Sequence, residues 1–365
     1  MVVDDKPLAS LRGELASLAI SRHAVRLVVV DRARDELRVA PFAALATLLR
    51  DGDLVVVNDA ATLPASLHGH TPRGEVLELR LSAPPRVADP DASGEGAAGP
   101  AGTRLYGVLF GAGDHRTRTE DRPPPPPLAV GDRVRFAALE ATIVALAGRR
   151  AELAVSGTPD MLWQALYAAG RPVQYAHRTE PLELWTVQTA YAARPWAAEM
   201  PSAGRPLTWD VLLSLRRAGV QLARLTHAAG VSSTGDDALD RALPWPERYE
   251  LPRATVAAVA ATRARGGRVI AVGTTVVRAL ESAALEAEQR SGELAAGSGL
   301  ATLRLDAAYV PRVVDGLLSG LHSPGESHFE LLQAFAPREQ LLRALELASA
   351  HGLSAHELGD ACLIV

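Results

Sequence analysis

Residues 266–284, GGRVIAVGTTVVRALESAA, constrain the fold of this chain more than any other stretch. Residues 268–272 form a short apolar run between glycines, which favours a buried strand. From Val276 onward the apolar positions recur with helical spacing. Thr274 and Thr275 lie at the junction, where a helix start favours a hydroxyl cap. The stretch therefore predicts a strand, a tight turn and a helix whose free N–H groups can hold an anion or a polar ligand group.

Arg278 falls in the first turn of this predicted helix. Its charge there faces the positive end of the helix dipole, which costs roughly 0.3–1 kcal/mol. Glu281 and Ser282, three and four residues on, are placed to neutralise or orient it. Two interpretations stay open: an ordinary surface Arg–Glu pair, or an arginine held beside a ligand.

Length and composition indicate a soluble globular protein with a sizeable core. The chain has 365 residues, of which 48% are hydrophobic and 22% charged, so two domains or one interrupted domain are expected. No apolar run reaches about 18 residues and the N-terminus has no apolar core, so we expect a cytoplasmic protein with no membrane partner. Cys362 is the only cysteine, which excludes an intrachain disulfide and a multi-cysteine zinc site. The net charge of −4 gives no global field that attracts nucleic acid.

The sequence changes character between His68 and Val155. Short runs with a period of two, separated by turn residues, predict strands at 75–81, 105–110, 133–136, 141–146 and 151–155. Before and after them the pattern is mixed, with predicted helices at 8–20 and 42–49 and predicted strands at 25–31 and 53–58. We therefore expect a discontinuous α/β main domain, 1–62 and 156–365, with an inserted small antiparallel β-barrel domain at 63–155.

Two motifs match known functional patterns but lack the surroundings that those functions require. Gly94–Gly99 matches a dinucleotide-binding pattern, but it lies in a Pro/Ala/Gly/Ser tract without a strand before it or a helix after it. His322, Glu326 and His328 resemble a metal cluster, yet Pro324 and Gly325 favour a loop entering a helix and no convincing third ligand is near. We expect no metal.

The 266–284 stretch closely resembles a motif of the S-adenosylmethionine:tRNA ribosyltransferase-isomerase family of queuosine biosynthesis. Weaker matches follow the family's order along nearly the whole chain, at Asn58-Asp59, 185–192, 200–208, His227, 307–317, His322 and 359–364. The family carries a β-barrel at the point where the period-two runs occur here. The resemblance implies transfer and isomerisation of the ribosyl part of S-adenosylmethionine onto a deazaguanine base in tRNA, with adenine and methionine leaving.

That reaction needs a base near the carbon beside the sulfonium, groups that hold a flipped-out acceptor base, and donors for departing adenine. The resemblance places catalysis on His322, His227 and Asp59. It places substrate binding on ten further residues: Asn58, Gln188, Tyr191, Gly204, Thr208, Gly273, Thr274, Thr275, Arg278 and Glu281. Structural roles stay open for Asn58 and Asp59 as turn caps, and for His322.

Several family positions are substituted. Ala61 and Ser66 stand where the family has arginines, and Pro206 stands where it has a histidine. These changes and the acidic charge weigh against tRNA as partner. Three hypotheses follow: the tRNA-modifying enzyme, a paralogue that uses S-adenosylmethionine or a related nucleoside with a small-molecule acceptor, and a non-catalytic binding protein on the same fold.

Overall fold

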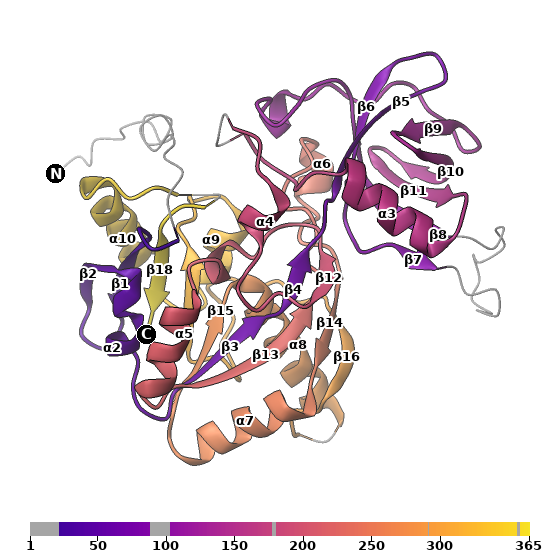
Figure 1. The fold of residues 1–365 in the computed structure, drawn as a ribbon. Coiled ribbons are helices and arrows are strands. Elements are labelled where there is room, and N and C mark those ends of the chain that lie inside the picture. Colours follow the sequence, from indigo (N-terminus) through magenta and orange to yellow (C-terminus); the bar gives the residue numbers. More distant parts are fainter. Residues whose placement is uncertain (1–21, 88–102, 177–179, 291, 356–357) are drawn as a thin grey trace.

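The computed structural model describes residues 22–87, 103–176, 180–290, 292–355 and 358–365. They form a nine-stranded sheet between layers of helices and a seven-stranded antiparallel sheet set to one side (Figure 1). The expected helix at 8–20 and the Gly94–Gly99 motif lie outside these residues.

The nine-stranded sheet has the order β16-β14-β13-β3-β15-β17-β18-β1-β2, and its central strands β13, β3, β15 and β17 run parallel. The strands are β1 (Arg26–Asp31), β2 (Glu36–Pro41), β3 (Leu54–Asn58), β13 (Gln221–His227), β14 (Glu247–Leu251), β15 (Val269–Val272), β16 (Gly297–Ala301), β17 (Gly316–Gly320) and β18 (Ala361–Ile364). Buried parallel strands require apolar residues on both faces, which explains the unbroken runs at β1, β3 and β15.

Two layers of helices cover the sheet. Val28 and Val56 face one layer, made of α7 (Arg253–Ala264), α8 (Thr274–Arg290), α9 (Ser327–Leu332) and α10 (Arg338–Ala350). Leu27 and Val55 face the other, made of η1 (Phe42–Ala44), α2 (Leu45–Leu48), η3 (Ser202–Gly204) and α5 (Trp209–Arg217). The main domain is thus a three-layer α/β/α arrangement.

The seven-stranded sheet closes into a barrel because β11 pairs with β8 as well as with β10. Its strands are β5 (Ser66–His70), β6 (Val76–Leu81), β7 (Arg86–Val87), β8 (Thr103–Phe110), β9 (Arg133–Phe136), β10 (Leu139–Ala147) and β11 (Arg150–Val155). Gly69 permits the close approach of β5 to β9, since a Cβ there would lie 2.2 Å from the Arg135 carbonyl oxygen. The expected fold class, an α/β main domain with an inserted antiparallel barrel, is confirmed.

The boundaries at 62/63 and 155/156 stay a prediction. The apolar core of the barrel takes in residues beyond Val155, because α3 (Pro159–Ala169) contributes Leu162 and Leu166 and the following loop contributes Val173. The remaining elements are β4 (Ala60–Thr62) paired with β12 (Arg194–Ala197), η2 (Thr119–Asp121), α4 (Leu184–Val187) and α6 (Asp237–Asp240). Within the described residues, no helix combines the length and apolarity needed to cross a lipid bilayer.

Candidate active site

A cavity of about 360 Å³ lies at the carboxyl ends of the parallel strands β15 and β17. Its walls come from the start of α8, from η3, from α9 and from the loops around β13 and β14. The chain moves from β3 to β13 on one side and then to β15 on the other. The cavity therefore lies beside a change in strand order, where open α/β sheets place their ligands.

The strand–turn–helix predicted for 266–284 is present as β15, Gly273 and α8. Gly273 has a φ of +87°, a conformation that residues with a Cβ rarely adopt. The cap position before α8 is Gly273 and not a threonine; its carbonyl accepts from the Val276 N–H at 3.2 Å. Thr274 and Thr275 are the first helical residues, so their amides lack intrahelical acceptors, and both residues line the cavity.

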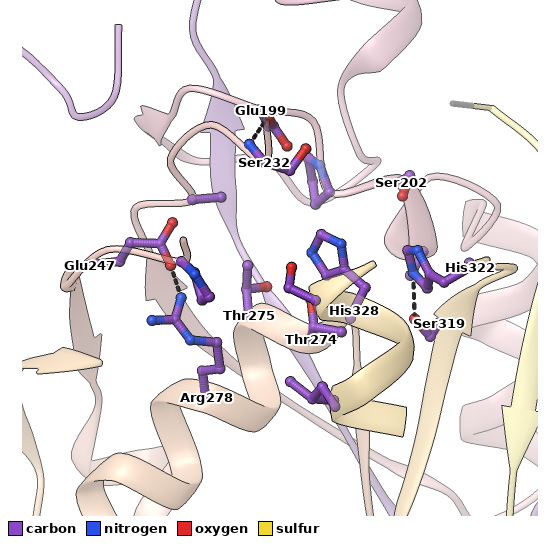
Figure 2. Close-up of a pocket in the computed structure, with 18 of the residues that line it drawn as sticks. Glu199, Ser202, Ser232, Glu247, Thr274, Thr275, Arg278, Ser319, His322 and His328 are labelled. Atoms are coloured by element: carbon purple, nitrogen blue, oxygen red, sulfur yellow. Dashed lines mark hydrogen bonds and ion pairs between the residues drawn. The ribbon is translucent and has the colours of Figure 1, made fainter. Parts of the chain in front are cut away.

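Arg278 lines the cavity but is buried and held by protein acceptors. Its Nε donates to the Leu303 carbonyl at 3.1 Å and its Nη2 donates to the carbonyls of Trp245 and Ala301 at 3.1 and 2.7 Å. Its Nη1 donates to the Glu247 carboxylate (Figure 2). Burial lowers the pKa of Arg278 to about 10, so it stays cationic at neutral pH.

The neutralising partner of Arg278 is Glu247 and not Glu281, which corrects the expected pairing along the helix. Glu281 is fully buried and accepts four hydrogen bonds, from the Tyr309 hydroxyl and from the backbone N–H groups of Arg312, Val313 and Val314. It is not among the cavity-lining residues. Glu281 therefore fastens the chain entering β17 to α8.

A histidine pair forms another wall of the cavity. The rings of His322 and His328 stack with centroids 4.7 Å apart. The His322 Nε2 atom lies 3.2 Å from the Ser319 hydroxyl at the end of β17, and its Nδ1 atom lies 3.6 Å from the Glu326 carboxylate. Burial, and next the neighbouring His322, lower the pKa of His328 to about 3, so that ring is neutral at physiological pH. Figure 2 shows this pair across the cavity from Glu247 and Arg278.

His227 and Asn58 lie behind the cavity wall. The Asn58 amide bridges two strands, donating to the His227 carbonyl at 3.0 Å and accepting from the His227 N–H at 2.9 Å. The His227 ring is fully buried, has no hydrogen-bond partner on either nitrogen, and places Nε2 at 3.6 Å from the Glu247 carboxylate. Burial and then the Arg278 charge lower the pKa of His227 to about 3.

Asp59, expected with the catalytic group, is not among the cavity-lining residues. It accepts from the Thr226 hydroxyl at 2.6 Å and faces the Arg224 guanidinium at 3.4 Å. Gln188 clamps the backbone of Thr62 through two hydrogen bonds of 2.9 Å.

Of the remaining predicted binding residues, only Gly204 lines the cavity together with the Gly273–Thr275 turn and Arg278. Tyr191 supports Gly204, with its hydroxyl 3.4 Å from the Gly204 carbonyl, and burial raises its pKa. Thr208 precedes α5, and its hydroxyl is buried without a partner.

Glu199 is a cavity residue that sequence reasoning missed. Its carboxylate accepts from the Ser232 N–H at 2.5 Å (Figure 2). It also accepts from the Tyr175 hydroxyl, so it links three segments that are distant in the sequence. A lone glutamate after a short strand carries no motif, so only the fold brings it to the site. The cavity therefore combines amide donors, hydroxyls, a pair of stacked histidines and carboxylates. Among the described residues, no group of three or more His, Cys, Asp or Glu side chains is arranged to hold a metal ion.

Comparisons with known proteins agree over nearly the whole chain. A family model described as queuosine biosynthesis protein matches residues 15–364. The S-adenosylmethionine:tRNA ribosyltransferase-isomerase of Trichlorobacter lovleyi is 32% identical over 354 residues, covering 95% of this chain and 94% of the relative. The enzyme of the same name from Sorangium cellulosum is 35% identical over 363 residues, covering 94% and 92%. The crystal structure of an S-adenosylmethionine tRNA ribosyltransferase from Thermotoga maritima has a TM-score of 0.50 and 22% identity, covering 96% and 97%, which supports the fold.

Proposed function

Because the chain belongs to the queuosine biosynthesis protein family, we propose that it is an S-adenosylmethionine:tRNA ribosyltransferase-isomerase. The substrate is S-adenosylmethionine and the acceptor is a deazaguanine base in tRNA. The ribosyl part is transferred and isomerised, and adenine and methionine leave.

One observation carries the assignment of this chemistry to the cavity. The start of α8 and the His322–His328 pair line the same cavity at the carboxyl ends of parallel strands. Helix amides at the positive end of a helix dipole suit the carboxylate of the methionine part of the substrate. Thr274 and Thr275 are the residues that would hold this carboxylate. The Glu199 carboxylate supplies negative charge for the cationic groups of S-adenosylmethionine.

His322 is our candidate for the base that removes a proton from the carbon beside the sulfonium. The Glu326 carboxylate at 3.6 Å favours the tautomer with the proton on Nδ1, which leaves Nε2 as the acceptor, and Ser319 orients that atom. When His322 takes up a proton, its stacked neighbour must not also be charged. The low pKa of His328 meets this condition.

His227 and Asp59 take positioning roles in this proposal. His227 adjoins the Glu247–Arg278 pair, and Asp59 holds the end of β3 against β13. Both act on the site through the residues that they contact.

The test is adenine release from S-adenosylmethionine with tRNA that carries the deazaguanine precursor. We expect release only when both substrates are present, and loss of release with tRNA that has guanine at the same position. Release without any tRNA would support a small-molecule acceptor instead. Absence of S-adenosylmethionine binding in calorimetry would leave a non-catalytic protein.

A further inference from the structure

A second cavity, of about 160 Å³, lies where the barrel meets the main domain. On the barrel side it is lined by Pro84, Pro85, Arg86 and Trp163, and on the main-domain side by Trp196 and Arg248. Glu247 lines both this cavity and the larger one. The two cavities are therefore neighbours that share the Glu247 residue as a wall.

The walls of the second cavity are aromatic and cationic. The Arg248 guanidinium lies 4.4 Å from the centroid of the Trp196 ring, and the Arg86 guanidinium lies 5.6 Å from that of Tyr106. In the described part of the chain, no carboxylate lies within ion-pair distance of either guanidinium. The neighbouring Arg194 differs, because Glu250 pairs with it. Arg86 and Arg248 thus keep charge that an anionic ligand can use.

We propose that this cavity binds one nucleotide of single-stranded RNA adjacent to the acceptor base, with its base packed against the Arg248 guanidinium that covers the Trp196 ring and its phosphates facing Arg86 and Arg248. This inference rests on the proposed function. Single-stranded RNA is recognised through bases stacked on aromatic rings and arginine planes, with cations along the backbone. When the acceptor base enters the larger cavity, the adjacent nucleotide of the RNA lies at Glu247, the residue that both cavities share. The aromatic residues of the second cavity begin there.

The net charge of −4, which weighs against RNA binding, does not by itself prevent RNA from binding at this cavity. Interactions between exposed charges are screened beyond about 8 Å at physiological salt. The Arg86 and Arg248 guanidinium groups, which form no ion pair among the described residues, therefore act on a phosphate in this cavity more strongly than acidic residues beyond that distance do.

The experiment measures binding of an anticodon stem-loop RNA by fluorescence titration, at several salt concentrations, to the full-length protein. Trp196→Ala should weaken binding about ten-fold or more, on the scale of a lost base–aromatic stack. Arg86→Gln and Arg248→Gln should each lower the slope of log affinity against log salt concentration by about 0.7. S-adenosylmethionine affinity, measured by calorimetry, should stay at the parent value in all three variants.

Two substitutions outside both cavities serve as matched controls, Trp209→Ala for the ring and Arg253→Gln for the charge; both residues are exposed. The arginine variants keep the test decisive if Trp196→Ala does not fold. Variants that bind RNA with the parent's affinity and salt slope, in a protein whose parent releases adenine with tRNA, would overturn the subsite and leave the function standing. A parent that neither binds the RNA nor releases adenine would overturn both.

Discussion

Arg278 and Glu247 form a buried ion pair that joins the second turn of α8 to the start of β14, with side chains only 5% and 11% exposed. The Glu247 carboxylate also accepts from the Gly230 N–H, so one carboxylate holds a helix and a loop of the cavity wall. Breaking a buried pair from one side leaves the other charge uncompensated, whereas removing both partners does not.

We therefore predict that Arg278→Met lowers the free energy of unfolding by about 3–5 kcal/mol. The double variant Arg278→Met/Glu247→Leu should lose less than the sum of the two single changes. Urea denaturation of the four proteins at neutral pH measures this coupling. Additive losses, together with weaker S-adenosylmethionine binding by Arg278→Met, would instead make Arg278 a direct ligand contact.

The neutral state of His227 predicts a pH dependence of stability. Its pKa is about 3 in the folded protein and about 6.5 in the unfolded chain, so the unfolded state binds more protons between these values. Folding stability is therefore lost as the pH falls below about 6.5. At pH 5 the loss from this residue is about 2 kcal/mol relative to neutral pH.

His227→Leu removes the titrating group, so the stability of this variant relative to the parent should rise by about that amount between pH 7.5 and pH 5. Denaturation curves at both pH values provide the measurement. A constant difference between variant and parent would mean that His227 does not titrate as its burial implies.

Thr275 offers a test of the ligand contacts at the start of α8. Thr275→Val keeps the shape and removes the hydroxyl, which accepts from the Asn58 amide at 3.5 Å. We expect S-adenosylmethionine affinity to fall about 3- to 10-fold, the scale of one hydrogen bond. Thr47→Val, at an exposed position on α2, is the control. Equal affinities in calorimetry would remove the Thr275 hydroxyl from the site.

Substitutions of His322 and Ser319 test whether these residues act in the chemical step and not in substrate binding. His322→Asn should lower the rate of adenine release about 10²- to 10⁴-fold with little change in S-adenosylmethionine affinity. Ser319→Ala should lower kcat by about ten-fold, because it loosens one hydrogen bond that orients the ring. It should also alter the pH profile of kcat, a readout that a purely structural serine would not change. A His322→Asn enzyme with parental kcat would assign the proton transfer elsewhere.

Periodicity predicted the elements that depend on local pattern. The strand at 269–272 follows from a short apolar run between glycines, the helix after Gly273 from a period of 3.6, and five of the seven strands of the barrel sheet from runs of period two; β5 and β7 were not predicted. It could not predict which distant side chains meet. Glu247 lies 31 residues from Arg278 and Glu199 lies 33 residues from Ser232, and these contacts exist only after the strands have paired.

The positions at which this chain differs from the family also show what the sequence alone cannot predict. Ser66, which replaces an arginine, is buried in the barrel, and its hydroxyl donates to Glu78 at 2.6 Å. Pro206 is also buried, and Ala61 is half-buried in β4. None of the three positions is exposed in this protein, so the substitutions alone do not show that phosphate contacts have been lost. Exposure of this kind cannot be read from the sequence.

We propose that this protein transfers the ribosyl part of S-adenosylmethionine to tRNA. The most direct test of this proposal compares two labelled substrates, one with carbon-14 in the ribosyl group and one with carbon-14 in the methyl group, incubated with precursor-containing tRNA. We expect label to enter tRNA only from the ribosyl-labelled substrate, and His322→Asn to slow this transfer as strongly as it slows adenine release. Incorporation from the methyl-labelled substrate, or no incorporation from either by the active folded protein, would contradict it.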